Sequence, residues 1–397
     1  MPLEIPYTAR HRAGFGIVLA GLLLMMASAS APSPFYPVLQ HDIGFSDPAL
    51  TGIFAVYTVF LLATLLTAGS CSDHLGRRPV LSVGFVGLAL SLLVFAQAST
   101  VEGLLIARAV QGIACALLLS TLSATIVDLE PPSRPGGAAI ANSVIPLVGL
   151  ALGALAAGYV MGVTSAAKLD VFGSLIALCL VLAVAVWGLP ETSPRHEGLL
   201  SALRPRLGLP PRARAAFWRA APAIIAGWAT GGLYLSLGAP IVARIFGLHS
   251  TLMQAFVVTL LSGMGALACY LARHRSPRQI TLGGTAALAI GTALTLAGMA
   301  LPSLPLYLVA LGVAGTGFGT CFYGALRTLI PLSAPGERGE FFAAILTLSY
   351  TAFGAPTLIA GLLLPHLGLT TTAVGYGVMI VVLASTAGLL RKFTRTD

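Results

Sequence analysis

The sequence predicts an all-α membrane protein in which twelve transmembrane helices form two pseudo-symmetric six-helix bundles. The first observation is composition: 57% of the 397 residues are hydrophobic and 9% are charged, against about 25% charged residues in a typical soluble domain. A soluble chain of this size could not bury that much apolar surface, so the surrounding solvent must be lipid. The second observation is a series of apolar segments, and the third is an internal repeat.

Twelve apolar segments follow one another along the chain, each of about 20 residues, which is enough to cross roughly 30 Å of hydrocarbon. Because the number is even, both termini lie on the same side of the membrane. The predicted spans are residues 14–39, 49–70, 80–98, 102–126, 137–163, 169–189, 221–246, 250–271, 280–300, 304–328, 341–364 and 370–390.

The positive charges indicate which side that is. Of the 22 lysines and arginines, all but Arg108, Lys168 and Arg244 fall in the termini or in loops on the same side as the termini. By the positive-inside rule that side is the cytosol, so we expect a multi-pass protein of a prokaryotic inner membrane with both termini cytosolic. Topology thereby explains the net charge of +9, and no nucleic-acid partner is needed.

The internal repeat relates the two halves of the chain. A shift of 203 positions superimposes residues that frame the fourth-to-fifth and tenth-to-eleventh spans: Gly112 on Gly315, Pro132 on Pro335, Gly136 on Gly339 and Gly158 on Gly361. Between the halves lies a hydrophilic stretch rich in arginine and proline. We therefore expect an N-terminal bundle at residues 1–189, a basic cytosolic linker at 190–220 and a C-terminal bundle at 221–397.

Catalytic and metal-binding patterns are missing from the sequence. The five cysteines are scattered through apolar segments and have neither disulfide nor metal-ligand spacing. There is no His-Glu-x-x-His, no Gly-x-Ser-x-Gly and no pair of carboxylates in the middle of a span, which argues against a membrane-embedded hydrolase or metalloprotease. We expect a protein that is not an enzyme and uses no cofactor.

The loop between the second and third spans reads Gly69-Ser-Cys-Ser-Asp73-His-Leu-Gly76-Arg77-Arg78. It resembles the corresponding loop of the major facilitator superfamily, whose pattern is Gly-x-x-x-Asp-x-x-Gly-Arg-Arg/Lys. All the patterned positions match, whereas the equivalent loop of the second half, Ala272 to Arg278, has no acid at the aspartate position. The resemblance implies two parallel six-helix halves that rock around a central site, usually in a monomer.

The resemblance also implies a gate at the cytosolic side. Asp73 is expected to meet the amino end of the eleventh span when this side is closed, and a carboxylate stabilises a helix amino terminus by about 0.3–1 kcal/mol. Glu340 lies near the same terminus and would compete or repel. Asp128 is placed to hold Arg77 or Arg78. The expected gating residues are Gly69, Asp73, Gly76, Arg77, Arg78 and Asp128.

Two more stretches are similar to the drug:proton antiporters of that superfamily. One is Arg108-x-x-Gln111-Gly112 in the fourth span. An arginine in lipid costs at least about 2.5 kcal/mol, so Arg108 is expected to face a polar cavity or a partner, unless it reaches the outer interface. The other is a small-residue stretch of the fifth span, predicted to pack closely, against the eighth span, through Gly149, Gly153 and Gly158. Generic small-residue packing would explain it as well.

Proton coupling would require a titratable acid in or beside the cavity, and the first span contains none. Asp42, just past the proline-rich end of that span, is the candidate proton carrier, with Arg108 as its electrostatic partner. The alternative is that Asp42 is an ordinary loop acid. A buried carboxylate gains pKa by desolvation and loses it beside arginine, so the net direction is open at this point.

The expected substrate cavity is apolar and aromatic, which suits lipophilic, planar or weakly cationic molecules. Packing or interfacial roles are the alternative for each aromatic residue. The candidate lining residues are Tyr36, Tyr57, Gln111, Asn142, Trp228, Tyr234, Gln254, Tyr323 and Tyr350.

We therefore predict a secondary active transporter that exports small lipophilic or weakly cationic, drug-like compounds by alternating access, in exchange for protons. Its partners would be the small-molecule substrate, protons and the lipid bilayer. Export of an endogenous metabolite and uncoupled facilitation are alternatives within transport. A further alternative is a non-transporting sensor or lipid-handling protein on the same fold, because a fold does not fix a function.

Overall fold

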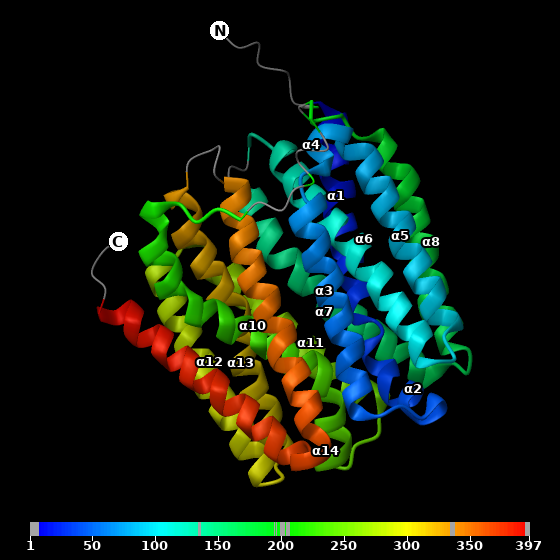
Figure 1. Ribbon diagram of the computed structural model, residues 1–397, viewed down its shortest axis with the longest axis vertical. Helices are drawn as coiled ribbons and strands as arrows, with labels where there is room; N and C mark the ends of the chain where they lie inside the picture. The colour runs from blue at the N-terminus through cyan, green and yellow to red at the C-terminus, as the bar shows by residue number, and fades with distance from the viewer. Residues whose placement is uncertain are drawn as a thin grey trace.

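The computed structural model describes residues 8–133, 136–193, 195, 197–198, 203, 207–333 and 338–393. Within these residues the regular structure is helical and no strand occurs, which confirms the all-α fold class. The long helices run side by side (Figure 1). The helices are α1 (Ala9–Ser30), α2 (Tyr36–Ile43), α3 (Asp47–Ala68), α4 (Cys71–Leu75), α5 (Arg77–Gln97), α6 (Val101–Asp128), α7 (Gly137–Val163), α8 (Ala167–Ala185), α10 (Pro211–Ile245), α11 (Thr251–Leu271), α12 (Pro277–Ala300), α13 (Leu304–Leu329) and α14 (Arg338–Phe393).

Twelve spans are present in this described part, as predicted. Eleven helical segments are long and apolar enough to cross a membrane, and the last of them, α14, holds two spans. Its backbone leaves the helical conformation at Gly368, where φ is 75° and ψ is 166°, a combination open essentially to glycine alone. Figure 1 shows the chain turning back at this end of α14, where the colour passes from orange to red.

The first span is broken by prolines. Helix α1 ends at Ser30, a 3₁₀ turn follows at Ser33–Phe35, and α2 continues to Ile43. Pro32 has no N–H, so the carbonyl of Ser28 loses the donor that would come from four residues further along an unbroken helix. The side chain of Gln111 on α6 supplies the missing hydrogen bond, from Nε2 to the Ser28 carbonyl oxygen at 3.0 Å. A break in one helix thus creates a polar contact inside the bundle.

The structure differs from the prediction at the linker. Helix α10 begins at Pro211, so the last ten residues of the expected linker, 211–220, are helical and continue directly into the seventh span. Ala213 and Phe217 on this extension are buried, and Phe217 packs in one apolar cluster with Phe341 and Ile345 of α14. The amphipathic spacing of these residues, rather than their arginine content, decides the local structure.

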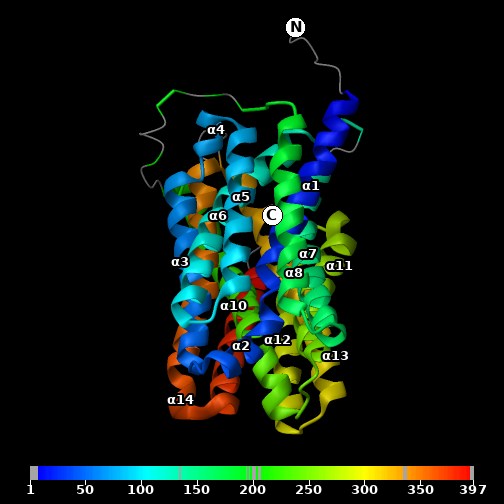
Figure 2. The same cartoon turned by 90° about the vertical axis from the view of Figure 1, so that its right-hand side faces the viewer.

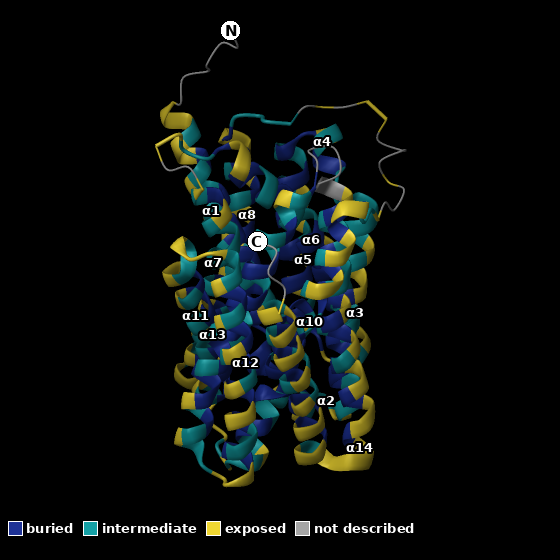
Figure 3. Cartoon of the chain, turned by 90° about the vertical axis from the view of Figure 1, so that its left-hand side faces the viewer, coloured by how far each residue is buried: buried dark blue, intermediate teal, exposed yellow. Residues whose placement is uncertain are grey.

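Buried side chains gather in two large clusters. The first is built mainly from α1 to α8, and the second from α10 to α14. Leu346 and Tyr350 of α14 belong to the first cluster, so the two groups of helices share buried contacts. Figure 3 shows buried residues between the helices and exposed ones on their outer faces. Many exposed residues are apolar, such as Val184 and Val309 at 73% and 70% exposure, as a lipid-facing surface requires.

Two helix crossings join the groups, and both depend on a glycine. A Cβ on Gly158 of α7 would collide with Ala255 of α11, and a Cβ on Gly361 of α14 would collide with Thr51 of α3. These two glycines are superimposed by the shift of 203 positions, and each packs against a helix of the other half. The pairing supports the division into two repeated halves.

The other glycines of α7 pack differently from the prediction. A Cβ on Gly149 would lie 2.6 Å from the carbonyl oxygen of Leu23, and one on Gly153 would meet Ala27 and Ser30. Both therefore face α1, and only Gly158 faces the eighth span, α11. A single stripe of small residues thus serves two neighbours, since it follows α7 around its axis.

We expect Gly153→Ala to lower the thermal stability of the protein, because the added methyl group must displace the α1 backbone. Overpacking of this kind costs about 1–3 kcal/mol. Thermal unfolding of the purified protein in detergent measures the effect.

The matched control is Gly162→Ala on the same helix, where the nearest atom to an added Cβ is 3.9 Å away. Alanine favours helix more than glycine does, so this variant should be neutral or slightly more stable. Equal melting temperatures for the two variants would contradict the close packing of α7 on α1.

Candidate functional site

Arg108 lies in the middle of a polar and aromatic cage, with 2% of its surface exposed. Its Nε donates to the Tyr36 hydroxyl at 2.7 Å, and its Nη1 donates to Gln111 Oε1 at 2.6 Å. The aromatic rings of four residues surround the guanidinium with centroids 5.1–5.5 Å away, those of Tyr36, Phe54, Tyr57 and Phe95. The structure therefore brings together Arg108, Gln111, Tyr36 and Tyr57, four of the residues proposed from the sequence.

The charge of Arg108 is not neutralised. Among the described residues no acid pairs with it, and its Nη2 has no hydrogen-bond partner. Asp42, the predicted partner, lies on α2 beside His41, with 62% of its side chain exposed. The structure thus does not bring Asp42 and Arg108 together. A buried cation without a counter-ion is costly, and the rings of the cage offset only part of that cost.

A second aromatic group lies on the other half of the chain. The ring of Trp228 on α10 is 4.7 Å from that of Tyr350 on α14 and 5.3 Å from that of Phe322 on α13. Tyr350, Trp228 and Tyr57 all contact the first apolar cluster. Two aromatic groups, one with a buried cation and one without, therefore meet where the halves join.

The remaining cavity candidates lie elsewhere. Tyr234 points to α12, where its hydroxyl contacts Thr295 Oγ1 at 2.9 Å. Asn142 donates to the Ser123 carbonyl at 3.3 Å within the first half. Tyr323 packs beside Cys269 and Ile280, and Gln254 is buried within α11. The sequence could place them on the right helices, but the face of each helix depends on neighbours distant in the chain.

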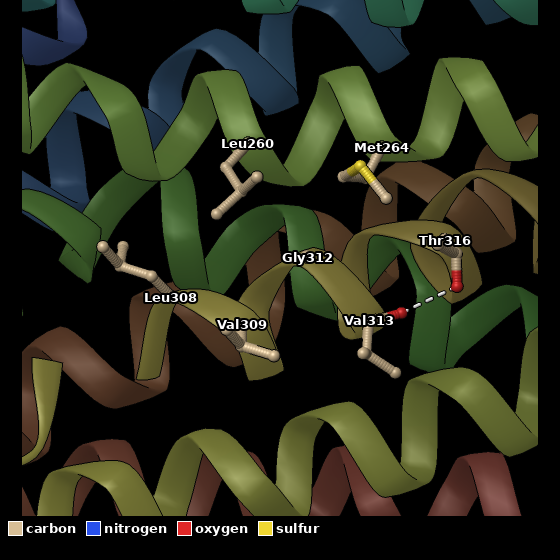
Figure 4. A pocket seen from close by; sticks show the side chains of 7 residues that line it. All are labelled: Leu260, Met264, Leu308, Val309, Gly312, Val313 and Thr316. Atoms are coloured by element: carbon tan, nitrogen blue, oxygen red, sulfur yellow. Dashed lines mark hydrogen bonds between the residues drawn. The ribbon is translucent and has the colours of Figure 1, made fainter. Parts of the chain in front are cut away.

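A cavity of about 500 Å³ between α11 and α13 is unrelated to this site (Figure 4). Its walls are apolar, formed by Leu260, Met264, Leu308, Val309, Gly312 and Val313. The one hydroxyl there, of Thr316, donates to the Val313 carbonyl at 2.8 Å. Val309 is 70% exposed, so the cavity opens outward, and lipid chains fit its chemistry.

The loop between α3 and α5 forms a compact charged cluster at the end of the molecule that also carries the N-terminus (Figures 1 and 2). Arg77 is 7% exposed and contacts Asp73 at 2.6 Å and Asp128 at 3.3 Å. Its Nη1 also donates to Ser72 Oγ at 2.6 Å. Of the two expected partners for Asp128, the structure selects Arg77 rather than Arg78. We call this end the loop end.

Glu191 completes the cluster, and the sequence analysis missed it. Its carboxylate accepts the backbone N–H of Arg77 at 2.8 Å and that of Arg78 at 3.4 Å. Burial would raise the pKa of Glu191, but these hydrogen bonds and that from the backbone of Ser193 hold its pKa below the usual range. Gly76 makes the contact possible, because its φ of 104° aims the helix amino terminus at Glu191 and a Cβ there would lie 3.0 Å from the carboxylate.

Gly69 follows the last residue of α3, and a Cβ on it would collide with the carbonyl oxygen of Leu65. The expected contact of Asp73 with the start of the eleventh span falls partly on residues 334–337, which lie outside the described residues. The side chain of Glu340, one turn into α14, is exposed. Asp73 is engaged by Arg77 on its own loop, so the gating set forms a unit within the first half.

The opposite end holds an ion pair between the halves. Asp47 at the start of α3 accepts two hydrogen bonds from Arg244 near the end of α10, each 3.0 Å long. Gln40 of α2 supports Asp47 with a third bond of 2.8 Å. The sequence offered one signal for this pair: both residues belong to the few charges outside the loops that are predicted to be cytosolic. Their 197-residue separation hid the contact.

Hydrogen bonds between the halves occur, in the described residues, at this end and near the middle of α7 and α11. Besides the ion pair they are Thr251 Oγ1 to the Gly158 carbonyl at 3.1 Å and Thr259 Oγ1 to the Ala151 carbonyl at 3.2 Å. At the loop end, the described hydrogen bonds stay within one half. The structure therefore has its polar seal on one side only.

Twelve spans, two helical groups meeting at small residues and a buried aromatic site between them define a multi-pass membrane transporter. The profile described as Major Facilitator Superfamily matches residues 18–357, and the chain belongs to that superfamily. The family is one of transporters, not of enzymes.

Similar proteins include a puromycin resistance protein of Streptomyces alboniger, 32% identical over 36% of this chain and 29% of its own length. Multidrug resistance protein 1 of Bacillus subtilis is 23% identical over 46% of both chains. The chain thus spans less than half the length of these relatives. A solved D-xylose-proton symporter superimposes with a TM-score of 0.76 at 14% identity, covering 94% of this chain and 96% of its own, which shows a shared fold.

We expect Asp47→Asn to loosen the seal at the end opposite the loop end, because it removes one charge of the pair and retains the side-chain shape. A partly exposed pair contributes at most about 1 kcal/mol, so opening should rise up to about fivefold. The reporter is Leu50→Cys, a position one turn after Asp47 that is 2% exposed, labelled with a water-soluble maleimide; the five native cysteines are all buried, which keeps the background low.

The control is Asp42→Asn, an exposed acid at the same end of the molecule. It should leave the labelling rate of Leu50→Cys unchanged. Equal rates with Asp47→Asn and with the native residue would show that the pair does not hold this end closed.

Proposed function

We propose that this transporter exports small lipophilic compounds from the cytosol by alternating access, in exchange for protons. The observation that carries the proposal is Arg108: a buried cation with an unused Nη2 donor, enclosed by aromatic rings and close to the junction of the two halves. A site of this kind offers apolar surface and one directed polar contact, which is what recognition of a drug-like molecule requires.

The charge of Arg108 narrows the substrate class. The rings of Tyr36 and Tyr57 already face the guanidinium, so Trp228 and Tyr350 are the aromatic surfaces left to a ligand. A fixed positive charge repels cations in a medium of low dielectric constant. Neutral lipophilic molecules that carry a hydrogen-bond acceptor therefore suit the site better than the weakly cationic compounds expected from the sequence.

Alternating access would be controlled at both ends. The pair Asp47–Arg244 would open when the site faces the outside, and the loop cluster around Asp73 would engage α14 when the cytosolic side closes. In this proposal the loop end is cytosolic, as the distribution of arginines indicates, and the membrane is a bacterial inner membrane. The names of the relatives, resistance to puromycin and to multiple drugs, support export as the direction.

Proton coupling is assigned to Asp47 rather than Asp42. Asp47 is the acid away from the cytosolic loops that bonds across the halves, so its protonation would weaken a contact between them. Asp42 makes no such contact in the described structure and is mostly exposed. The neutral surroundings of Arg108 favour a second candidate, uncoupled facilitation, because no acid stands ready to exchange a proton with the substrate.

Transport by the purified protein in liposomes, with an imposed pH gradient and a pH-sensitive dye inside, tests the proposal. Neutral, cationic and anionic lipophilic compounds of similar size are added in turn. Discharge of the gradient by the neutral class supports exchange with protons, whereas equilibration of labelled compound without discharge supports the facilitator. The absence of any transport would contradict both.

Arg108→Gln should reduce transport at least tenfold in this assay, because one buried charge-assisted hydrogen bond is worth about 1.5–3 kcal/mol. Arg108→Lys should retain part of the activity, since it keeps the charge and loses the forked geometry. The control is Lys168→Gln, a cation whose bond is to the Ala98 carbonyl. Full activity of Arg108→Gln would remove Arg108 from the site.

Asp73→Asn should slow turnover severalfold while leaving substrate affinity close to its native value. Its contact with Arg77 holds the loop, and no contact with the proposed site is involved. Binding measured by quenching of tryptophan fluorescence separates the two effects. Unchanged turnover would rule out a gating role for Asp73.

A further inference from the structure

A cavity of about 260 Å³ lies at the arginine-bearing end of α10, between α10, α12, α13 and α14. Alanines of α10, α13 and α14 form much of its wall, and Leu332 closes one side. Its polar lining consists of the arginines Arg212, Arg219 and Arg391 and of two threonines. The hydroxyls of Thr281 and Thr328 donate to carbonyls of their own helices, so the arginines are the donors that face the cavity. No acid lines it in the described residues. The cavity is separate from Arg108 and from the loop cluster.

The surrounding charges add to those of the lining. Arg278 on α12 donates to the carbonyl of Lys392 at 3.1 Å, which brings one more guanidinium group close to Arg391. Arg219 uses its Nε for the Ala215 carbonyl at 2.9 Å, and this leaves its two terminal nitrogens for a ligand. Several cations around one cavity repel one another, so a bound anion would stabilise the arrangement.

The arginines of the cavity have no counterparts in the first half of the chain. The shift of 203 positions places Ala9, Gly16 and Gly188 where the second half has Arg212, Arg219 and Arg391. The three arginines are therefore a specific feature of the second half and not a general result of the repeated fold.

The surface next to the cavity is suited to lipid. Trp218, one position before Arg219, is 64% exposed, and an exposed tryptophan beside arginines is typical of the membrane interface. Leu389 and Leu390, next to Arg391 on α14, are exposed at 56% and 38%. Acyl chains would meet these leucines while the head group enters the cavity.

We propose that this cavity binds the phosphate head group of an anionic phospholipid. The arginine side chains supply donors to the phosphate oxygens, and the alanine wall accommodates the glycerol. A phospholipid head group and a soluble phosphate compound both offer a phosphoryl group to the arginines. The exposed tryptophan and leucines beside the cavity favour the lipid. The site does not depend on the proposed transport function, because binding can be measured without a substrate.

The experiment uses the full chain in a neutral detergent and measures binding of dioleoyl-phosphatidylglycerol by native mass spectrometry. Dioleoyl-phosphatidylcholine is the uncharged comparison. The double variant Arg219→Gln/Arg391→Gln should bind phosphatidylglycerol about tenfold more weakly, because each cation near an anionic lipid contributes a few-fold in affinity. The matched control, Arg214→Gln/Lys392→Gln, removes the same charge from the same two helices outside the cavity and should stay within twofold of native.

Equal loss in the two double variants would overturn the proposal, since a general effect of net charge would then explain the binding. Equal affinity for the two lipids would overturn it as well. Displacement of phosphatidylglycerol by millimolar glycerol phosphate or inorganic phosphate would assign the cavity to a soluble phosphate instead. Ala220→Leu, which fills the cavity without changing charge, should also weaken binding and provides the test if the arginine variants do not fold.

Discussion

The close approach of helix backbones at Gly158 and Gly361 is the constraint on which the rest of the structure depends. Lipid surrounds the protein, so burial of apolar surface gives little net free energy for helix association. Close van der Waals packing at small residues must provide it instead. Each glycine lies at a crossing between the halves and meets a threonine or alanine of the other half. Thr251 adds a hydrogen bond to the Gly158 carbonyl. The site between the halves can form only because these crossings hold.

The seal formed around Asp47 and Arg244, at the end opposite the loop end, is strong enough to favour one closed conformation and weak enough to open again. It consists of a partly exposed ion pair and two hydrogen bonds to backbone carbonyls, contributions of about 1 kcal/mol or less each. The loop end has its charges paired inside one half instead. Such an unequal distribution is what a two-state device needs, because neither arrangement is locked. Arg108 lies between the two ends, and its Nη2 is a buried donor without a hydrogen-bond partner.

Sequence reasoning succeeded where the pattern is local. Span lengths follow from hydropathy, and the loop cluster follows from residues within ten positions of one another, such as Asp73 and Arg77. It failed where a contact joins distant segments. Tyr36 at the start of α2 does reach Arg108, but Asp42 lies near the other end of the same helix with its side chain mostly exposed, so the two charges do not pair. The pair of Asp47 with Arg244 and that of Glu191 with the Arg77 backbone depend on helix packing, which no nearby residue reveals.

For small residues the sequence predicts close packing but not the packing partner. The stripe on α7 correctly indicated close packing, but one helix has two neighbours, and the spacing alone does not say which glycine meets which. The cavity candidates Tyr234 and Tyr323 illustrate it for aromatic residues: each lies on an expected helix and faces its own bundle. Rotation of a helix about its axis is decided by the whole set of partners.

Gly368 has a consequence for motion. It turns the chain within a single residue, so the eleventh and twelfth spans are joined without a loop. The two spans therefore behave as two rigid arms that meet at Gly368. The first arm, the eleventh span, crosses α3 at Gly361, where the halves meet. The second arm, the twelfth span, carries Ala387 and Arg391 at the wall of the cavity that we propose binds a phospholipid head group. Any tilt of the eleventh span during the transport cycle would therefore be transmitted to the twelfth span. The shape of the lipid-binding cavity at the far end of that span would then change with each turnover.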